Sequence, residues 1–367
     1  MDFEFSTEAD EAATLAARIL TDRATPDRMR AVEADGDRYD HELWQDIADA
    51  GLLSLAIPES YGGAGLGLVE ALRVVVEVGR TVAPVPVAPH VACALVISEL
   101  GTDAQRELWL YGAATGERVL VAAVSEDLST LPTRPLTTAR RTDEGWVLNG
   151  TKTLVRAGAR ADLLLVTAST PDGVGVFLVE TLTDGVTTEA QRTTDGDSAA
   201  RITFDDAALP ADARLGDGAA ARLADLLTAT ACAEQLGVTE GALARTAAYA
   251  KTREQFGRPI GTFQAVSQRL ADGYIDTLGQ RLTLWQAAWR LAEGLPAEKE
   301  LASAALFAAD AGHRVAHTAV HVHGGVGIDL DGETHRYFTA AKRWEFALGG
   351  TTRNALTIGR ALAAEPV

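Results

Sequence analysis

The sequence predicts an α+β chain of three domains, and the prediction depends on three features of its apolar pattern. Apolar residues recur every three or four positions in the first and last thirds, which is typical of amphipathic helices. In the middle the repeat changes to two, and turn residues separate short β-rich runs. We therefore expect an N-terminal helical domain over 1–118, a small β-barrel or sandwich over 119–216 and an antiparallel four-helix bundle over 217–367.

Charge and hydropathy narrow the classes of partner. The 367 residues carry a formal net charge of −18, which opposes binding to nucleic acid or to an anionic membrane surface. No apolar run approaches the roughly 20 residues that a membrane-spanning helix needs. The acidic start MDFEFSTEADE does not resemble a secretory or transit signal. We expect a cytoplasmic protein with neither a nucleic-acid nor a membrane partner.

The cysteines and histidines predict no metal site. Cys93 and Cys232 stand among alanine and other small or apolar residues, so we expect two buried thiols rather than a disulfide or a metal cluster. His321 and His323 lie beside a glycine pair, without the carboxylate or cysteine company of a metal centre.

The expected elements follow the change of period along the chain. Leu15, Ile19 and Leu20 mark one N-terminal helix, and 43–48 marks another. A glycine-rich loop over 62–67 lacks the preceding strand and the Lys-Ser or Lys-Thr ending of a phosphate cradle, so a nucleotide role is only weakly indicated. The β-rich runs are 145–150, 162–167, 175–179 and 201–204. The C-terminal helices are expected over 219–249, 263–293, 297–322 and 351–363.

The stretch Arg253–Gln264, REQFGRPIGTFQ, lies between the first two of these C-terminal helices. Arg253 and Arg258 put two cations next to Phe256, and glycine and proline predict a bend. A guanidinium beside an aromatic ring at a helix corner suits a flat anionic ligand such as a dinucleotide. A solvated arginine in an exposed turn is the alternative. The apolar stripe that follows contains Phe263, Val266, Leu270, Tyr274, Leu278, Leu282, Trp285 and Trp289.

This stretch resembles the signature of the acyl-CoA dehydrogenase family, R-x-x-F-G-x-x-I-x-x-F-Q, and matches every fixed position. A second segment, AVHVHGGVG over 319–327, is similar to the family's A-V-Q-x-x-G-G-x-G. In that family both segments contact an FAD that the neighbouring subunit holds. The resemblance covers nearly the whole chain and implies the same fold and FAD as cofactor. It implies these cofactor-binding residues: Arg253, Gln255, Phe256, Gln264, His321, Gly324 and Gly325.

Two segments depart from the family where its members hold the flavin in cis. The family's T-E-P-x-A-G-S-D is replaced by Ser125-Glu126-Asp127-Leu128-Ser129-Thr130. After the matched N-G-x-K at 149–152, the family's W-I-T or W-I-S is replaced by Leu154-Val155-Arg156. An aliphatic side chain and a bulky cation neither stack on nor hydrogen-bond the flavin ring in the same way.

The family's catalytic base is also missing. The reaction needs a carboxylate that takes the proton α to the thioester while hydride leaves the β carbon for the flavin. The usual glutamate of an E-G-T sequence corresponds to Leu348, or to Gly349 with a one-residue shift, and an alternative position falls near Leu227 and Thr228. We therefore predict no catalytic residue in this chain.

Three nearby carboxylates could serve as a relocated base. They are Glu345, Glu234 and Glu240. A shift by one helical turn displaces a carboxylate by roughly 5 Å, beyond hydrogen-bond reach of the α proton. We expect them to be solvated helix charges.

The chain thus matches the family at the residues that contact a neighbour's FAD. It departs from the family at the residues that hold the flavin in cis and at the catalytic base. The resemblance implies the non-catalytic, β-type subunit of a heteromeric enzyme, similar to the paired α2β2 acyl-CoA dehydrogenases of actinobacterial steroid side-chain degradation. Its partners would be a homologous catalytic subunit, an acyl-CoA substrate and an electron-transfer acceptor. Two alternatives remain open: a self-sufficient homotetrameric dehydrogenase with a relocated base, and a flavin-free structural subunit.

Overall fold

The computed structural model describes residues 4–34, 36–127 and 133–364. The chain divides into two compact units. The sheet unit comprises 27–71 and 84–227, and the bundle unit comprises the described residues of 1–26, 72–83 and 228–367. The α+β fold class that the sequence predicts is confirmed, with helices before and after a β region in chain order.

Two helices of the sheet unit, α3 and α6, begin at side chains that cap them. Asp40 accepts a hydrogen bond from the Leu43 amide at the start of α3, and Thr102 with Gln105 forms a capping box at the start of α6. Helix α5 is apolar all round, and it is buried accordingly. The described helices that lie wholly or almost wholly in this unit are α2 (Pro26–Ala34), α3 (His41–Asp49), η1 (Glu59–Tyr61), α5 (Val87–Leu100) and α6 (Asp103–Ala114).

Seven strands form one mixed sheet, in the order β1-β4-β2-β3-β7-β6 with β5 on β4. The long β3 and β7 pair antiparallel, and β1 pairs parallel with β4. The four β-rich runs expected from the sequence fall within or largely within β3, β4, β5 and β7. The strands are β1 (Leu120–Ala123), β2 (Thr138–Arg141), β3 (Gly145–Arg156), β4 (Leu163–Thr170), β5 (Gly173–Glu180), β6 (Val186–Gln191) and β7 (Ala199–Pro210).

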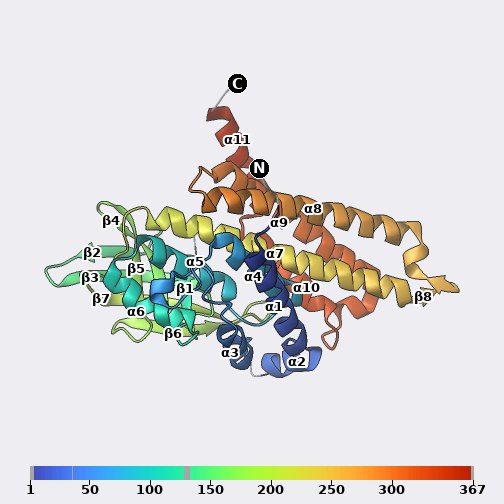
Figure 1. Ribbon diagram of the computed structural model, residues 1–367, viewed down its shortest axis with the longest axis horizontal. Helices are drawn as coiled ribbons and strands as arrows, with labels where there is room; N and C mark the ends of the chain where they lie inside the picture. The colour runs from blue at the N-terminus through green and yellow to red at the C-terminus, as the bar shows by residue number, and fades with distance from the viewer. Residues whose placement is uncertain (1–3, 35, 128–132, 365–367) are drawn as a thin grey trace. The chain divides into compact units, whose positions relative to one another are not determined.

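The bundle unit contains the long C-terminal helices and a two-stranded hairpin at the end of α7 and α8 (Figure 1). Its helices are α1 (Thr7–Arg23), most of α4 (Leu68–Thr81), most of α7 (Ala219–Thr252), η2 (Ile260–Thr262), α8 (Gln264–Ala292), α9 (Glu298–His323), η3 (Gly324–Ile328), α10 (Thr334–Ala347) and α11 (Gly350–Ala364). The hairpin pairs β8 (Glu254–Gln255) with β9 (Arg258–Pro259). The helical C-terminal domain is confirmed, and among the described residues α10 adds a fifth α-helix to the four that the sequence predicts.

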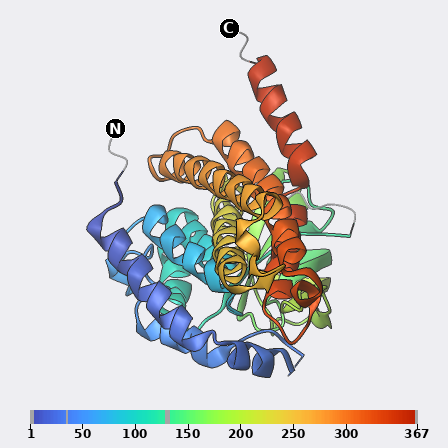
Figure 2. The same ribbon diagram turned by 90° about the vertical axis from the view of Figure 1, so that its right-hand side faces the viewer.

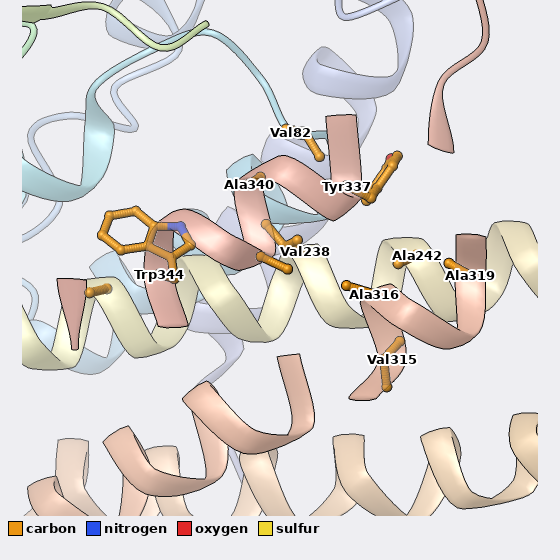
Figure 3. Close-up of a cluster of buried hydrophobic side chains, with 11 residues drawn as sticks. Val82, Val238, Ala242, Val315, Ala316, Ala319, Tyr337, Ala340 and Trp344 are labelled. Carbon is orange, nitrogen blue, oxygen red and sulfur yellow. The ribbon is translucent and has the colours of Figure 1, made fainter. Parts of the chain in front are cut away.

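One buried cluster of the bundle unit is built mainly from alanine and valine with two aromatic anchors. Val238 of α7, Val315 of α9, and Tyr337 and Trp344 of α10 belong to one buried cluster (Figure 3). Glycines let α4 and α7 approach backbone to backbone. A Cβ built on Gly79 would lie 2.0 Å from the carbonyl oxygen of Glu234. Substitution there would force the two helices apart.

One face of α8 carries large apolar side chains that the chain itself leaves exposed. The helix expected from the apolar stripe is confirmed, but Tyr274, Leu282 and Trp289 of that stripe are exposed. The face that α8 buries instead consists largely of small and polar residues, such as Gly273, with few large apolar ones. In the described part of the chain no helix is both long and apolar enough to cross a bilayer.

Candidate functional site

A cavity of about 680 Å³ lies at one end of the bundle unit. It is formed by the end of α7, the β8–β9 hairpin, the end of α9 and η3. Five of the seven predicted cofactor-binding residues line it together: Arg253, Gln255, His321, Gly324 and Gly325. The other lining residues are Tyr249, Ile260, Val322, His323, Val326, Ile328 and Asp329.

Arg253 is held by its backbone and leaves its guanidinium available. Its amide donates to Tyr249 O at 2.9 Å, and its carbonyl accepts from the Ile260 amide at 2.8 Å, which fixes the turn from α7 into the hairpin. Elsewhere arginines pair with carboxylates, as Arg222 does with Glu99 at 2.6 Å. Among the described residues, Arg253 has no such carboxylate within 4.0 Å. In so acidic a chain, an unpaired guanidinium in a cavity favours an anionic ligand.

The two helices that end at the cavity do not themselves attract an anion. Both α7 and α9 reach it with their carboxyl ends, where the helix dipole favours cations. The positive charge must therefore come from side chains, chiefly Arg253. Gly324 adopts φ +65° and ψ −140°, a backbone conformation that favours glycine, and a Cβ built on Gly324 or on Gly325 would meet no atom within 4 Å. The backbone of this glycine pair is thus open to a ligand at van der Waals distance.

An aromatic pair forms the apolar side of the cavity. The rings of Tyr249 and His323 stack with centroids 4.2 Å apart and an interplanar angle of 21°. His323 Nδ1 lies 2.8 Å from Ala319 O, and because a carbonyl only accepts, Nδ1 carries the proton. Tyr249 was not among the cofactor-binding residues that the sequence predicted. Its position one turn before Arg253 on α7 was the available signal.

Phe256 and Gln264 do not line the cavity. Phe256 occupies the hairpin tip, is 92% exposed and has φ +53°, a left-handed conformation rare for a bulky residue. The Phe256 ring meets the Phe263 ring edge to face. The Arg258 guanidinium lies 4.4 Å from the centroid of the Phe263 ring. Gln264 begins α8. The FAD contacts of these two residues stay a prediction, as do those of the five that line the cavity.

Glu234 and Glu240 are not the solvated charges that the sequence predicted. Both are buried on α7, and each is paired with an arginine from another helix of the bundle unit, which offsets the cost of burying its charge. Glu234 pairs with Arg343 at 3.3 Å. Glu240 pairs with Arg80 at 2.6 Å and with Arg281. Both carboxylates are therefore enclosed in the bundle unit rather than presented to a substrate.

Glu345 is also engaged, on the seam between α9 and α10. Its carboxylate accepts a hydrogen bond from Lys342 at 2.9 Å and lies 3.1 Å from His313 Nδ1. Partial burial raises the pKa of Glu345, but the hydrogen bonds from Lys342 and His313 outweigh it and hold the pKa below its usual value. Glu345 is therefore engaged in contacts between α9 and α10.

The corner between α10 and α11 contains no carboxylate where the sequence placed the missing base. Leu348 closes α10, and Gly349 and Gly350 follow with φ +79° and +67°. Asn354 locks this corner, since its side-chain amide donates to the carbonyls of Leu348 and Gly350, both at 2.8 Å. Figure 2 shows α11 projecting from the other helices of this unit.

In the sheet unit, the first segment that departs from the family motif contributes Glu126 to a buried ion pair. Lys152 Nζ lies 2.7 Å from Glu126 Oε1, and the same oxygen accepts from the Thr137 hydroxyl at 2.7 Å. Burial lowers the pKa of Lys152, and Glu126 offsets only part of that effect. The pair is fully used within the sheet. Residues 128–130 of this segment lie outside the described residues.

The second departing segment presents no flat or hydroxyl-bearing side chain. Leu154 is exposed with φ +52°, and its amide donates to the Gln191 side chain at 2.7 Å. Arg156 pairs with Asp197 at 2.7 Å. Asp197 is itself buried and lies 4.0 Å from the buried Arg38. The family that the sequence resembles has a small hydroxyl donor at this position, where this chain has an arginine in an ion-pair network.

Comparison with known proteins identifies the family. Three models match: the acyl-CoA dehydrogenase N-terminal domain over 6–117, middle domain over 122–207 and C-terminal domain over 218–363. The chain belongs to the acyl-CoA dehydrogenase family. A curated relative, "Acyl-CoA dehydrogenase FadE27" of Mycobacterium tuberculosis, is 44% identical over the full length of both chains.

Two solved structures are similar to this acyl-CoA dehydrogenase chain over almost its whole length. One is the crystal structure of the ChsE4-ChsE5 complex from Mycobacterium tuberculosis, at 45% identity, with 100% of each chain covered and a TM-score of 0.96. The other is described as a Tcur3481-Tcur3483 steroid ACAD G363A variant, at 43% identity, with 97% of this chain and 98% of that chain covered and a TM-score of 0.93. The predicted domain limits at 118/119 and 216/217 stay a prediction.

FAD, the predicted cofactor, is confirmed as the cofactor of this family. The residues of the chain fit one part of FAD and not the other. The cavity with its unpaired Arg253 and open glycine pair suits a pyrophosphate and a flat base. In the described part of the sheet unit, the segment 154–156 offers neither a ring-stacking nor a hydroxyl side chain for the flavin ring, because Leu154 is aliphatic and Arg156 is paired to Asp197.

Proposed function

We propose that this chain is the non-catalytic subunit of a heteromeric, FAD-dependent acyl-CoA dehydrogenase. In this proposal a homologous catalytic subunit holds the FAD, and the cavity at Arg253 receives its ADP half in trans. The observation that carries the proposal is the contrast between an anion-binding cavity with an unpaired guanidinium and the lack of a free carboxylate at the expected base positions.

When bound, FAD would supply the acceptor for the hydride that leaves the β carbon of the acyl-CoA. The role of this chain would be to bind and orient the cofactor. Arg253 would hold the pyrophosphate through its guanidinium, and the backbone at Gly324 and Gly325 would let the ligand approach closely. The Tyr249–His323 stack would give an apolar surface for the adenine. The α proton would go to a carboxylate of the catalytic subunit.

The three carboxylates near the expected base positions support a non-catalytic role. Glu234 and Glu240 are buried in ion pairs, and Glu345 is hydrogen-bonded to Lys342 and lies beside His313. A general base must come within hydrogen-bond reach of the proton that it takes. Glu234 and Glu240 are buried in ion pairs and Glu345 is engaged by Lys342, so a self-sufficient dehydrogenase with a relocated base is disfavoured.

Substrate class and assembly are extended from the relatives. A similar structure is described as a steroid ACAD and another as a two-protein complex. We infer a steroid side-chain acyl-CoA as substrate and an α2β2 tetramer in which half of the sites work. Electrons pass on to a separate electron-transfer acceptor.

The test is the flavin affinity of the complex formed with the catalytic subunit. A charge-assisted hydrogen bond in a partly closed site contributes roughly 1.5–3 kcal/mol, so Arg253→Ala should weaken FAD binding about tenfold or more. Arg253→Lys should recover part of the loss, because an ammonium cannot make the paired contact. Arg258→Ala is the matched control, since Arg258 lies on the same hairpin, stacks on Phe263 and does not line the cavity.

FAD dissociation from the purified complex is measured by flavin fluorescence for wild type and the three variants. Equal retention in Arg253→Ala and wild type would refute the trans contact. Acyl-CoA oxidation by this chain alone, lost on Glu345→Gln or Glu234→Gln, would establish the self-sufficient enzyme instead.

A further inference from the structure

Asp329 is a carboxylate in a cavity that otherwise suits an anion. It follows η3 and lines the cavity together with Arg253, His321 and His323. Among the described residues no arginine, lysine or histidine nitrogen lies within 4.0 Å of its carboxylate oxygens. A net negative group weakens the attraction of the cavity for phosphates, so its presence there calls for a physical reason.

The loop fixes Asp329 in place. Its carbonyl oxygen accepts from the Gly332 amide at 3.1 Å and lies 3.0 Å from His335 Nδ1. One side-chain oxygen accepts from the Asp331 amide at 3.1 Å, which orients the carboxylate. The other oxygen is available to a ligand. The Asp331 amide therefore orients the negative charge that Asp329 presents at the cavity.

An acyl-CoA dehydrogenase meets two ligands that contain adenosine diphosphate. FAD carries it with both ribose hydroxyls free, whereas coenzyme A carries it with a phosphate on the ribose 3′-oxygen. Arg253 and the Tyr249–His323 stack would accept either ligand, because they address the pyrophosphate and the base. Only a group at the ribose distinguishes the two, and a carboxylate accepts hydrogen bonds from hydroxyls and repels a phosphate.

We propose that Asp329 is a specificity residue that reserves this cavity for the ADP of FAD and excludes the 3′-phosphorylated ADP of acyl-CoA. The proposal rests on the proposed function, because it assigns the cavity to the FAD of a partner. It adds that the cavity rejects the substrate's own nucleotide, which is abundant at the site during turnover. A 3′-phosphate carries about two negative charges at neutral pH, so the preference for ADP is roughly tenfold or larger at moderate salt.

The probes are ADP and adenosine 3′-phosphate 5′-diphosphate, the nucleotide of coenzyme A. Each is titrated into the full chain up to about 10 mM, and binding is followed by saturation-transfer NMR. This method detects dissociation constants of about 1 mM, which suit a ligand bound by this subunit without its partner. Wild type should bind ADP at least about tenfold more tightly. Asp329→Asn keeps an oxygen that accepts hydrogen bonds and removes the charge, so the two affinities should converge to within about threefold.

Asp331→Asn is the matched control, because it removes one charge from the same loop and Asp331 does not line the cavity. It should leave the preference intact. Raising the salt from about 0.05 M to 0.5 M should reduce the wild-type preference, since screening weakens the repulsion.

The inference is overturned if wild type binds both nucleotides equally, if neither binds, or if Asp329→Asn keeps the preference. These outcomes are separate from the failure of the proposed function, which would appear as unchanged FAD affinity in the Arg253→Ala complex. A chain that needs Arg253 for FAD but does not discriminate between the nucleotides would contradict only the role of Asp329.

Discussion

His90 is a buried histidine that joins three elements of the sheet unit. Its Nε2 lies 3.1 Å from Ala113 O, and its Nδ1 accepts from the Leu120 amide at 3.2 Å. The ring packs edge-on against Trp44. Both nitrogens are thus satisfied by the neutral ring alone, because a second proton on Nδ1 would face the Leu120 N–H. Burial lowers the pKa of His90 from 6.5 to about 4.

This depressed pKa predicts acid lability. The folded chain binds the proton later than the unfolded chain does, so stability is full above pH 6.5 and falls as the pH approaches 4. A difference of this size corresponds to about 3 kcal/mol. His90→Gln can still donate to Ala113 and accept from Leu120, so it should lose about that much less stability over the same range. Urea unfolding at several pH values measures both slopes, and identical slopes would show that His90 does not control the effect.

At the scale of single residues, the sequence predicted five of the residues that line the cavity but did not predict the others. Arg253, His321 and Gly324 were found because they lie in two short motifs. Tyr249 and Asp329 were not, because their contribution depends on the chain reversal that brings the ends of α7 and α9 together. The sequence predicted Glu234 and Glu240 as solvated charges, but both are buried. Their arginine partners come from other helices, so no pattern in the neighbouring sequence indicates the burial.

At the scale of elements, the β8–β9 hairpin holds an exposed aromatic residue in a strained backbone. Phe256 is followed by Gly257 at φ +77°, so two consecutive residues are left-handed. For a phenylalanine this conformation costs about 1–2 kcal/mol. A fold has no stability reason to keep a strained and nearly fully exposed ring. A contact with a partner or its cofactor would supply one.

Phe256→Gly should therefore separate stability from function. Glycine relieves the strain but adds entropy to the unfolded chain, so the free energy of unfolding should change by less than about 1 kcal/mol. The flavin content of the complex should fall, because the ring is lost. Phe256→Leu, which keeps an apolar side chain, should retain more flavin. Calorimetry of the chain and flavin absorbance of the complex measure the two effects, and unchanged flavin in Phe256→Gly would contradict the assignment.

Elements were predictable where their period was long and clear. The stretches of α7, α8 and α9 gave unbroken helical patterns, whereas α10 is short, has no capping side chain and carries mostly polar or bulky residues. Strand β6 reads VTTEAQ and is largely exposed, so it offered no alternation of apolar and polar residues. Its place in the sheet comes from pairing with β7, which local sequence does not specify.

At the scale of the whole molecule, composition narrows the classes of partner but does not specify the surface that a protein partner would cover. Net charge and hydropathy argued against nucleic acid and membranes, but the sequence could not say that the stripe on α8 faces outward. Its exposure became visible only when the small residues on the opposite side were found in the core. Exposed large apolar side chains in a row along one helix are typical of a protein interface.

The α8 stripe leads to the last prediction, that it binds the catalytic partner subunit. Leu282 is 71% exposed at the middle of this helix. Burying a leucine at an interface contributes roughly 1.5–3 kcal/mol, so Leu282→Arg, which also buries a charge, should weaken association at least tenfold. The chain itself should stay folded, because exposed positions tolerate arginine. Leu182→Arg is the matched control, since Leu182 is 94% exposed between β5 and β6 and makes the same chemical change on another surface. Sedimentation of the mixed subunits measures the association. If Leu282→Arg binds the partner as tightly as Leu182→Arg does, the stripe is not the interface.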